Sequence, residues 1–243
     1  MNKYKIILVA GARPNFMKIA PLIHEMKKYS NIEPCLVHTG QHYDDSMSGI
    51  FFKELGIQIP EINLGVGSGT HAEQTAKIMI SFERVCIDYS PRLVVVFGDV
   101  NSTIACALVA KKLAIPVAHV ESGLRSSDEK MPEEINRILT DHISDLLFTT
   151  SQNANDNLES EGISKKKIFF VGNVMIDSLV KVQKRLSESK ILDELGLKNS
   201  EYCLATLHRP SNVDVKQKLS GIISAFETIS SECPVVFPLH PRT

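Results

Sequence analysis

The chain has 243 residues, of which 43% are hydrophobic and 23% are charged, close to the averages of folded globular proteins. This composition excludes a disordered or fibrous chain, and the length is sufficient for two domains. A net charge of -1 offers no general attraction for nucleic acid or for an anionic membrane, so we expect a small molecule as the ligand.

The sequence also disfavours export and membrane insertion. Lys5 interrupts the apolar run at the N-terminus and no convincing cleavage site follows it, which predicts a strand rather than a signal peptide. Apolar stretches fall well short of the roughly 20 residues that cross a bilayer. The five cysteines are scattered without a Cys-x-x-Cys pair, which disfavours a disulfide framework and a zinc site. We therefore expect a cytoplasmic protein with reduced thiols.

Short apolar runs alternate with longer segments of helical period along the first two thirds of the chain. This pattern is typical of an α/β fold, a doubly wound, Rossmann-like parallel sheet with helices on both faces. Most runs are apolar throughout, as buried parallel strands are. The predicted strands lie at residues 5–10, 33–38, 61–64, 93–97, 117–120, 146–149 and 168–171.

Residues 70–89 predict an amphipathic helix between the third and fourth strands, and Pro91 blocks its extension. The apolar residues that share one face of this helix are Ala72, Ala76, Met79, Ile80 and Ile87.

A second domain is predicted near the end of the chain. The polar stretch 187–199 is the least core-like segment, so we place one domain at residues 1–186 and the start of another at residues 187–243. A strand at 202–206, a helix at 215–229 and a strand at 234–238 restart the pattern of the first domain. Two strands cannot bury a sheet on both sides, so we expect the second Rossmann-like domain to be incomplete in this chain.

Two cations follow the first predicted strand. In open parallel sheets ligands bind outside the carboxyl ends of the strands, so residues just after each strand are candidates for the site. Arg13 and Lys18 stand at a helix entrance, where backbone N–H groups also favour anions. Arg13 could hold a diphosphate and Lys18 could add charge, although a solvated pair explains them equally well.

Three further segments bring carboxylates to the same edge of the sheet. The fourth strand leads into Gly98 and Asp99, the fifth leads into Glu121, and a later helix begins with Glu133 and Glu134. Asp99 could instead cap a helix, and the two glutamates could serve only the helix dipole. Crowded carboxylates beside cations favour general acid/base chemistry, with a divalent metal as the minor interpretation.

His208 and Arg209 follow the first strand of the second unit, and His240 and Arg242 repeat this placement after the next strand. His208 could be an acid, a base or a phosphate donor. The glycine-rich segment at residues 65–69 lacks the full dinucleotide spacing and does not follow the first strand, so no nicotinamide cofactor is predicted.

Together these motifs resemble the non-hydrolysing UDP-N-acetylglucosamine 2-epimerases, over the whole chain and in the same order. The resemblance implies a fold similar to the two-domain glycosyltransferases called GT-B, with the substrate in the interdomain cleft. The motifs that carry it are Gly11-x-Arg13-Pro14…Lys18, Gly40-Gln41-His42, Gly98-Asp99, His119-Val120-Glu121-Ser122-Gly123-Leu124-Arg125, Pro132-Glu133-Glu134-x-Asn136-Arg137 and His208-Arg209.

The resemblance implies interconversion of UDP-GlcNAc and UDP-ManNAc through loss of the C2 proton and departure of UDP, which then re-adds to a glycal. It requires no cofactor and no metal, and it implies a homodimer formed through the first domain. The residues implied as catalytic are Asp99, Glu121, Glu133 and His208, and those implied as substrate contacts are Arg13, Lys18, Arg137, His208 and Arg242.

Two departures from the family pattern modify these expectations. Tyr43 and Asp44 follow the Gln-His pair, and Glu73 stands where substrate-activated bacterial members carry arginine, so activation of that kind is not expected. The sequence also ends before the Ser-Gly-Gly segment with which family members hold the nucleotide. A hydrolysing relative, an epimerase for a related UDP-2-acetamido sugar acid and a non-catalytic sugar-nucleotide-binding fragment remain alternatives.

Overall fold

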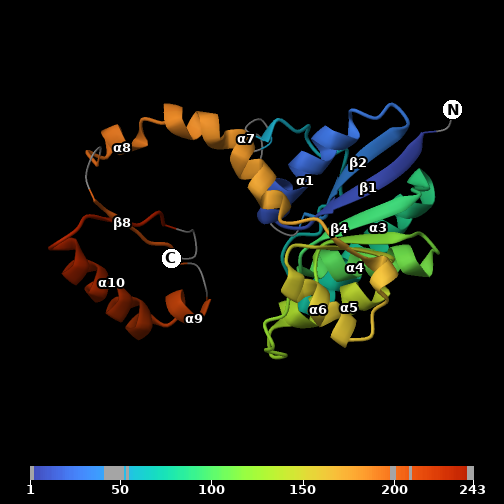
Figure 1. Cartoon of the computed structure of the whole chain (residues 1–243). Coiled ribbons are helices and arrows are strands. Elements are labelled where there is room, and N and C mark those ends of the chain that lie inside the picture. Colours follow the sequence, from blue (N-terminus) through green and yellow to red (C-terminus); the bar gives the residue numbers. More distant parts are fainter. Residues whose placement is uncertain (1–2, 41–51, 53–54, 198–200, 208–209, 240–243) are drawn as a thin grey trace. The chain divides into compact units, whose positions relative to one another are not determined.

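The computed structural model describes residues 3–40, 52, 55–197, 201–207 and 210–239 (Figure 1). The chain divides into two compact units, Met1–Val182 and Gln183–Thr243. This division falls inside one helix, whereas the sequence places the end of the first domain at residue 186. None of the described helices combines the length and apolar character that a bilayer crossing requires.

The first unit is built on a parallel sheet with the strand order β3-β2-β1-β4-β5-β6-β7. Each predicted strand of this unit is confirmed, with small differences at the ends. β5 continues to Ser122, beyond the predicted end at Val120, because a shift in register lets pairing with β6 resume after Glu121. The strands are β1 (Tyr4–Ala10), β2 (Ile32–His38), β3 (Ile62–Asn63), β4 (Leu93–Phe97), β5 (Val117–Ser122), β6 (Leu146–Thr149) and β7 (Ile168–Phe170).

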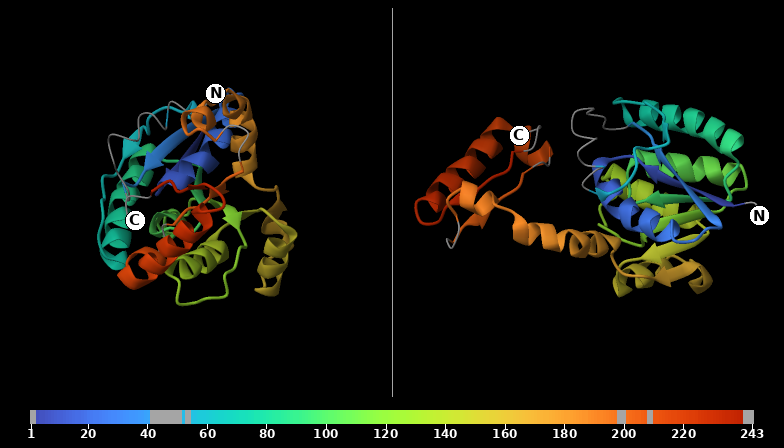
Figure 2. Two further views of the ribbon diagram at one scale, coloured as in Figure 1. Left: turned by 90° about the vertical axis from the view of Figure 1, so that its left-hand side faces the viewer. Right: turned by 90° about the horizontal axis from the view of Figure 1, so that it is seen from above.

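Helices cover both faces of this sheet, which confirms the doubly wound fold. Residues of α1 pack against one face in a cluster that includes Ile19 and Leu8, and α3 and α4 pack against the other with Phe82 and Val9 (Figure 2). The helices are α1 (Arg13–Met26), α3 (His71–Tyr89), α4 (Asn101–Lys112), α5 (Pro132–Ile143), α6 (Gln152–Ser160) and α7 (Val174–Glu188), with a short 3-10 turn at Lys165–Lys167.

The sequence predicts helix α3, but the predicted apolar face is not the face that packs on the sheet. Gln74, Ile78, Phe82 and Cys86 are the buried residues of α3, whereas Ile80 and Ile87 of the predicted face are 58% and 60% exposed. Both faces carry apolar residues, so periodicity alone does not select the one that meets the sheet.

The ends of α3 follow local rules. Thr70 and Glu73 form a reciprocal capping box at the start, so Glu73 has a structural role at this position. The helix ends at Ser90, which adopts a left-handed conformation with φ 53° just before Pro91.

The second unit contains β8 (Cys203–Leu204) and β9 (Val235–Val236), which pair in parallel and are connected through α10 (Lys216–Ser230). The predicted strand, helix and strand are therefore confirmed, with shorter strands. Phe226 of α10 packs edge-on against Phe237, with ring centroids 5.3 Å apart. The short helices α8 (Ile191–Glu194) and α9 (Pro210–Val213) complete the described part of this unit.

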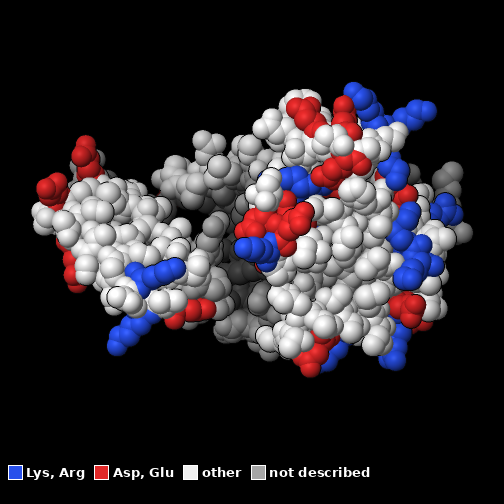
Figure 3. All heavy atoms as spheres, turned by 90° about the horizontal axis from the view of Figure 1, so that it is seen from below, with Lys and Arg blue, Asp and Glu red and all other residues white. Residues whose placement is uncertain are grey.

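Charges of both signs are intermixed on the face that Figure 3 shows. Lys and Arg side chains stand among Asp and Glu side chains, around a broad uncharged area of the first unit. No strong field of one sign dominates the described part of this face.

Candidate active site

The turn after β1 is fixed by one asparagine. The side-chain oxygen of Asn15 accepts hydrogen bonds from the backbone N–H groups of Gly11 and Ala12, at 3.0 and 2.8 Å. Its amide nitrogen donates to the carbonyl oxygen of Phe97 at 3.3 Å. Since β1 and β4 are neighbours at the point where the strand order reverses, Asn15 binds together the two strand ends at which open sheets hold ligands.

Gly11 allows a second close approach at this edge. A Cβ atom on Gly11 would lie 2.5 Å from Oγ of Ser102, so only glycine fits. The Ser102 hydroxyl lies 2.8 Å from the hydroxyl of Thr39, which follows β2. The turns after β1, β2 and β4 are therefore in direct contact.

Lys18 and Glu121 form an ion pair at this edge. The ammonium of Lys18, on α1, binds Oε2 of Glu121, and their side chains are only 11% and 21% exposed. A Cβ atom on Gly98 would lie 3.4 Å from Nζ of Lys18 and 3.6 Å from Oε2 of Glu121, so the glycine leaves room for the pair. The structure thus brings together two of the residues that the sequence singled out, from segments 103 positions apart.

Glu121 is held in an unusual backbone conformation. Its φ is 71°, in the left-handed region that residues with a Cβ atom rarely adopt. The register of β5 with β6 shifts between Val120 and Ser122, so Glu121 is the extra residue of a bulge. Bulges re-aim side chains, and backbone strain of about 1–3 kcal/mol persists only where the surroundings enforce it. Such strain is typical of functional positions.

A cavity of about 310 Å³ opens beside the ion pair. Leu22, Val120 and Phe148 give it apolar walls, and Asp177 of α7 contributes a second carboxylate. An ion pair beside apolar walls interacts more strongly than one in bulk water. The cavity can therefore receive a small polar group of a ligand next to Lys18 and Glu121.

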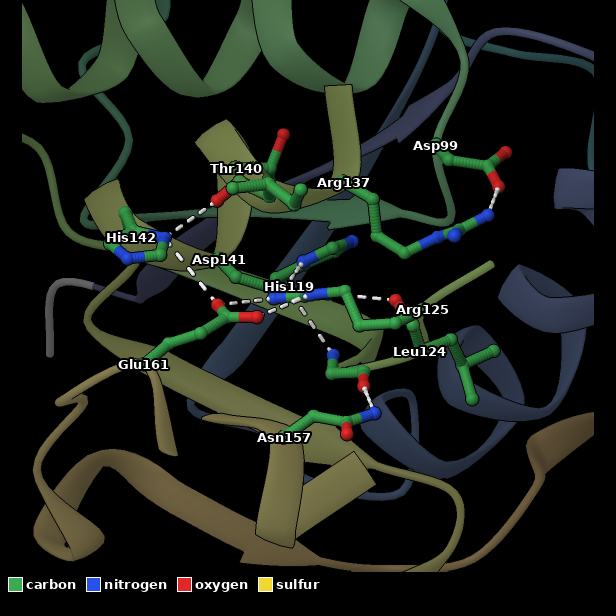
Figure 4. A network of polar contacts seen from close by, with 12 residues as sticks. Asp99, His119, Leu124, Arg125, Arg137, Thr140, Asp141, His142, Asn157 and Glu161 are labelled. Atoms are coloured by element: carbon green, nitrogen blue, oxygen red, sulfur yellow. Dashed lines mark hydrogen bonds and ion pairs between the residues drawn. The ribbon is translucent and has the colours of Figure 1, made fainter. Parts of the chain in front are cut away.

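Asp99 belongs to a second charged cluster. Nη2 of Arg137 binds Oδ2 of Asp99 at 2.6 Å (Figure 4), and Nη1 of Arg137 binds Glu134. Asn136 donates a hydrogen bond to the carbonyl oxygen of Asp99 at 2.9 Å. The N-cap of α4 is Val100, so Asp99 does not cap this helix, and the alternative role that the sequence left open is excluded.

Glu134 lies deep in this cluster, while Glu133 is exposed at the start of α5. The backbone N–H groups of Ser126 and Ser127 donate to Glu134 at 2.9 and 3.0 Å. Burial raises the pKa of Glu134, but these hydrogen bonds and the charge of Arg137 outweigh it and hold the pKa below its usual value. The sequence singled out Glu133, yet Glu134 is the residue that contacts the Asp99 cluster. The sequence carries no signal that tells which of these two adjacent glutamates is buried.

The remaining predicted site residues are less informative in this structure. Arg13 is the first residue of α1. His208 and Arg242 lie outside the described residues, as do Arg209, His240 and the Gln41-His42 segment. Within the described ranges, the His, Cys, Asp and Glu side chains form no group of three or more that could hold a metal ion.

Known proteins resemble this chain over nearly its whole length. A family model described as UDP-N-acetylglucosamine 2-epimerase matches residues 24–243. A protein of Methanococcus maripaludis named UDP-N-acetylglucosamine 2-epimerase homolog is 51% identical over 241 residues, which are 98% of this chain and 66% of the relative. A Pseudomonas aeruginosa protein named UDP-2,3-diacetamido-2,3-dideoxy-D-glucuronate 2-epimerase is 44% identical over 243 residues, 98% of this chain and 67% of its own.

A solved structure shares the fold. The Methanocaldococcus jannaschii UDP-GlcNAc 2-epimerase, crystallised in complex with UDP-GlcNAc and UDP, matches with a TM-score of 0.89 and 45% identity. The match covers 98% of this chain and 67% of that protein. The chain therefore spans about two thirds of the length of these relatives.

Proposed function

Because the chain belongs to the UDP-N-acetylglucosamine 2-epimerase family, we propose that the full-length protein interconverts UDP-GlcNAc and UDP-ManNAc. A base removes the C2 proton, the bond from C1 to the UDP oxygen breaks, and a double bond forms between C1 and C2. UDP then returns to C1 while a proton returns to the opposite face of C2. Each group that leaves comes back, so the reaction needs no cofactor and no oxidant.

The Lys18–Glu121 ion pair is the observation that supports this proposal most directly. A carboxylate beside an ammonium group, at the edge of an apolar cavity, can take or give a proton while the cation stabilises developing negative charge. Asp99 provides a second carboxylate on the neighbouring turn, paired with Arg137. We assign the proton transfers at C2 to Asp99 and Glu121 together.

The other site residues keep the roles that the family resemblance implies. We propose Glu133 and His208 as further catalytic residues. We propose Arg13, Lys18, Arg137, His208 and Arg242 as contacts of the substrate and its diphosphate. In this assignment residues 1–186 carry the carboxylates, and residues 187–243 begin the domain that binds the nucleotide.

We further propose that the protein acts in the cytoplasm and supplies a sugar donor for polysaccharide synthesis. The unpaired, buried thiols of Cys35, Cys86 and Cys106 fit a reducing compartment. Burial raises the pKa of Cys86 to about 12, so this thiol stays protonated and unreactive at neutral pH.

An epimerase for a related sugar acid is the second candidate. It is favoured by the 44% identity to the Pseudomonas aeruginosa relative, whose name specifies a diacetamido glucuronate substrate. The two substrates differ in the groups on C3 and C5 of the sugar, so the same proton transfer at C2 would serve both.

Proton NMR in D2O tests the function and separates the candidates. UDP-GlcNAc and the UDP-diacetamido glucuronate are each incubated with the full-length protein. The proposal expects the anomeric signal of UDP-ManNAc to appear from UDP-GlcNAc, with deuterium entering at C2 because the removed proton exchanges with solvent. Conversion of only the sugar acid would select the second candidate. Free N-acetylmannosamine would indicate a hydrolase, and an unchanged spectrum with both substrates would refute an epimerase.

A homodimer through the first unit is part of the proposal. The face of α3 that carries Ala72, Ala76 and Met79 lines a groove of about 420 Å³ together with Ile135 of α5. Ile135 and the nearby Leu139 are each 49% exposed. Exposed apolar side chains that line a groove suit the matching surface of a second copy.

Replacing Ile135 with arginine is expected to convert the dimer into a monomer, because the charge would be buried in the interface without a partner. Light scattering coupled to size-exclusion chromatography measures the mass. Ile59→Arg is the matched control, since Ile59 is 72% exposed and lies outside the groove. A dimer that survives Ile135→Arg would place the interface elsewhere.

A further inference from the structure

One histidine on β5 connects the two turns that carry the proposed catalytic carboxylates. His119 is completely buried. Its Nε2 atom lies 2.8 Å from the carbonyl oxygen of Gly98. Its Nδ1 atom lies 2.7 Å from Oδ1 of Asp141 on α5, and Figure 4 shows these two side chains together. Gly98 directly precedes Asp99, so the ring fixes the backbone next to the residue that bears this carboxylate.

Both ring nitrogens of His119 lie within hydrogen-bond distance of an oxygen atom. A carbonyl oxygen can only accept, so Nε2 must carry a proton toward Gly98. Burial raises the pKa of Asp141, but the charge and hydrogen bond of His119 and the hydrogen bond of Arg125 outweigh burial and hold the pKa below its usual value. Asp141 is therefore an ionised carboxylate, held against Nδ1 of the ring.

The second oxygen of Asp141 reaches the other turn. Oδ2 accepts a hydrogen bond from the backbone N–H of Gly123 at 3.1 Å, two residues after Glu121. It also accepts one from Nη1 of Arg125 at 2.8 Å, and Arg125 is anchored by Glu161 at 2.7 Å. Only glycine fits at position 123, since its φ is 78° and a Cβ atom there would lie 2.4 Å from the carbonyl oxygen of Ala154.

We propose that His119 and Asp141 are positioning residues, which hold the turns bearing Asp99 and Glu121 at a fixed separation. The inference rests on the proposed function for its catalytic meaning. His119 sets the Gly98 carbonyl, Asp141 sets the Gly123 N–H, and the bond between them makes the two turns one rigid unit. Both side chains are fully buried, so the pair acts through the backbone.

A purely stabilising role explains this pair less well. Burying a carboxylate together with its partner costs about as much free energy as the contact returns, and apolar residues of similar volume often stabilise equally. What distinguishes the pair is that each of its side chains binds a backbone group of a different turn. A fixed separation of two carboxylates matters because a displacement of about 1 Å can lower a rate about a hundredfold.

Hydrogen exchange followed by NMR tests the proposal without reference to activity. In His119→Phe, the amide of Gly98 is expected to exchange about tenfold faster or more, because its turn loses the bond to the ring. The amide of Gly123 is expected to exchange faster as well, because Asp141, which binds it, loses its histidine partner. The amide of Val9 in the middle of the sheet keeps its protection. His24→Phe is the control, because it removes a histidine from α1 that contacts the carbonyl oxygen of Gly56, away from both turns. Unchanged exchange at both glycines, or equally faster exchange at Val9, would overturn the proposal.

Kinetics of the full-length protein gives the second readout. His119→Phe is expected to lower kcat about a hundredfold while KM changes far less, because substrate contacts remain and only the alignment is lost.

Should His119→Phe not fold, Asp141→Asn replaces it in both measurements. That variant keeps the ring in place but weakens the hold on Gly123, so faster exchange at Gly123 with a lower kcat is expected. Normal exchange and normal kcat in a folded variant would refute the positioning role. An inactive wild type would count against the proposed function alone, since the exchange experiment still decides the inference.

Discussion

Asp99→Asn is expected to lower kcat for epimerisation by a factor of about 10²–10⁴ in the full-length protein, the contribution of one positioned acid or base. An asparagine has the same shape and can still accept a hydrogen bond from Arg137, but it cannot carry a proton to or from the substrate. The Asp99 side chain is 33% exposed, so its loss should leave the free energy of unfolding nearly unchanged. Turnover is measured by NMR or by a coupled product assay, together with urea denaturation.

Asp88→Asn provides the control for this result. Asp88 is an exposed residue of α3, far in sequence from the charged clusters, and its substitution should leave kcat unaltered. An Asp99→Asn protein that turns over like wild type would remove Asp99 from the mechanism and weaken the epimerase assignment itself.

Replacing Glu121 is expected to lower turnover as strongly as replacing Asp99. The variants Glu121→Gln and Glu121→Gly are expected to differ in stability, in an unusual order. Glu121→Gln removes the charge that pairs with Lys18, and leaving a largely buried ammonium without its partner costs about 1–3 kcal/mol. Glu121→Gly loses the same ion pair but relieves the left-handed backbone at φ 71°, which returns about 1–2 kcal/mol. The glycine variant should therefore be the more stable of the two, although both are inactive.

Urea denaturation of the two Glu121 variants measures this difference, and the product assay measures their turnover. Ser90 offers a matched control for the backbone effect, because it also has a positive φ, 53°, at the end of α3 and lies outside the site. Ser90→Gly should be stabilised without any effect on turnover. A Glu121→Gly protein that is less stable than Glu121→Gln would show that the bulge is not strained, and an active Glu121→Gln would exclude Glu121 from proton transfer.

The strands of the first unit could be predicted from the sequence because buried parallel strands consist of continuous apolar residues. The rule that ligands bind at the carboxyl edge then selects Lys18, Asp99 and Glu121 without a structure, and the fold places Lys18 against Glu121. The face of α3 could not be predicted in the same way. Both faces of this helix carry apolar residues, and tertiary packing determines which of them contacts the sheet.

The polar connections of the site are the part that sequence reasoning missed. His119 contacts Gly98 and Asp141, which lie 21 and 22 positions away. No local spacing predicts such contacts, although a histidine within an otherwise apolar strand is a signal that a buried partner must exist. The buried position of Glu134 could not be predicted for a similar reason. Which of two adjacent glutamates turns inward depends on the loop at residues 126–127, whose backbone donors are invisible in the sequence.

The close contact at Gly11 restricts how this protein can change over evolutionary time. Even alanine at this position would meet the Ser102 side chain at about 2.5 Å, so the contact forbids a substitution that most helix entrances accept. Replacing Ser102 with glycine would relieve much of the clash but would break its contact with Thr39. Neither single substitution therefore keeps both the close approach at Gly11 and the contact between Ser102 and Thr39. We therefore expect Gly11 and Ser102 to tolerate substitution only when both are changed together.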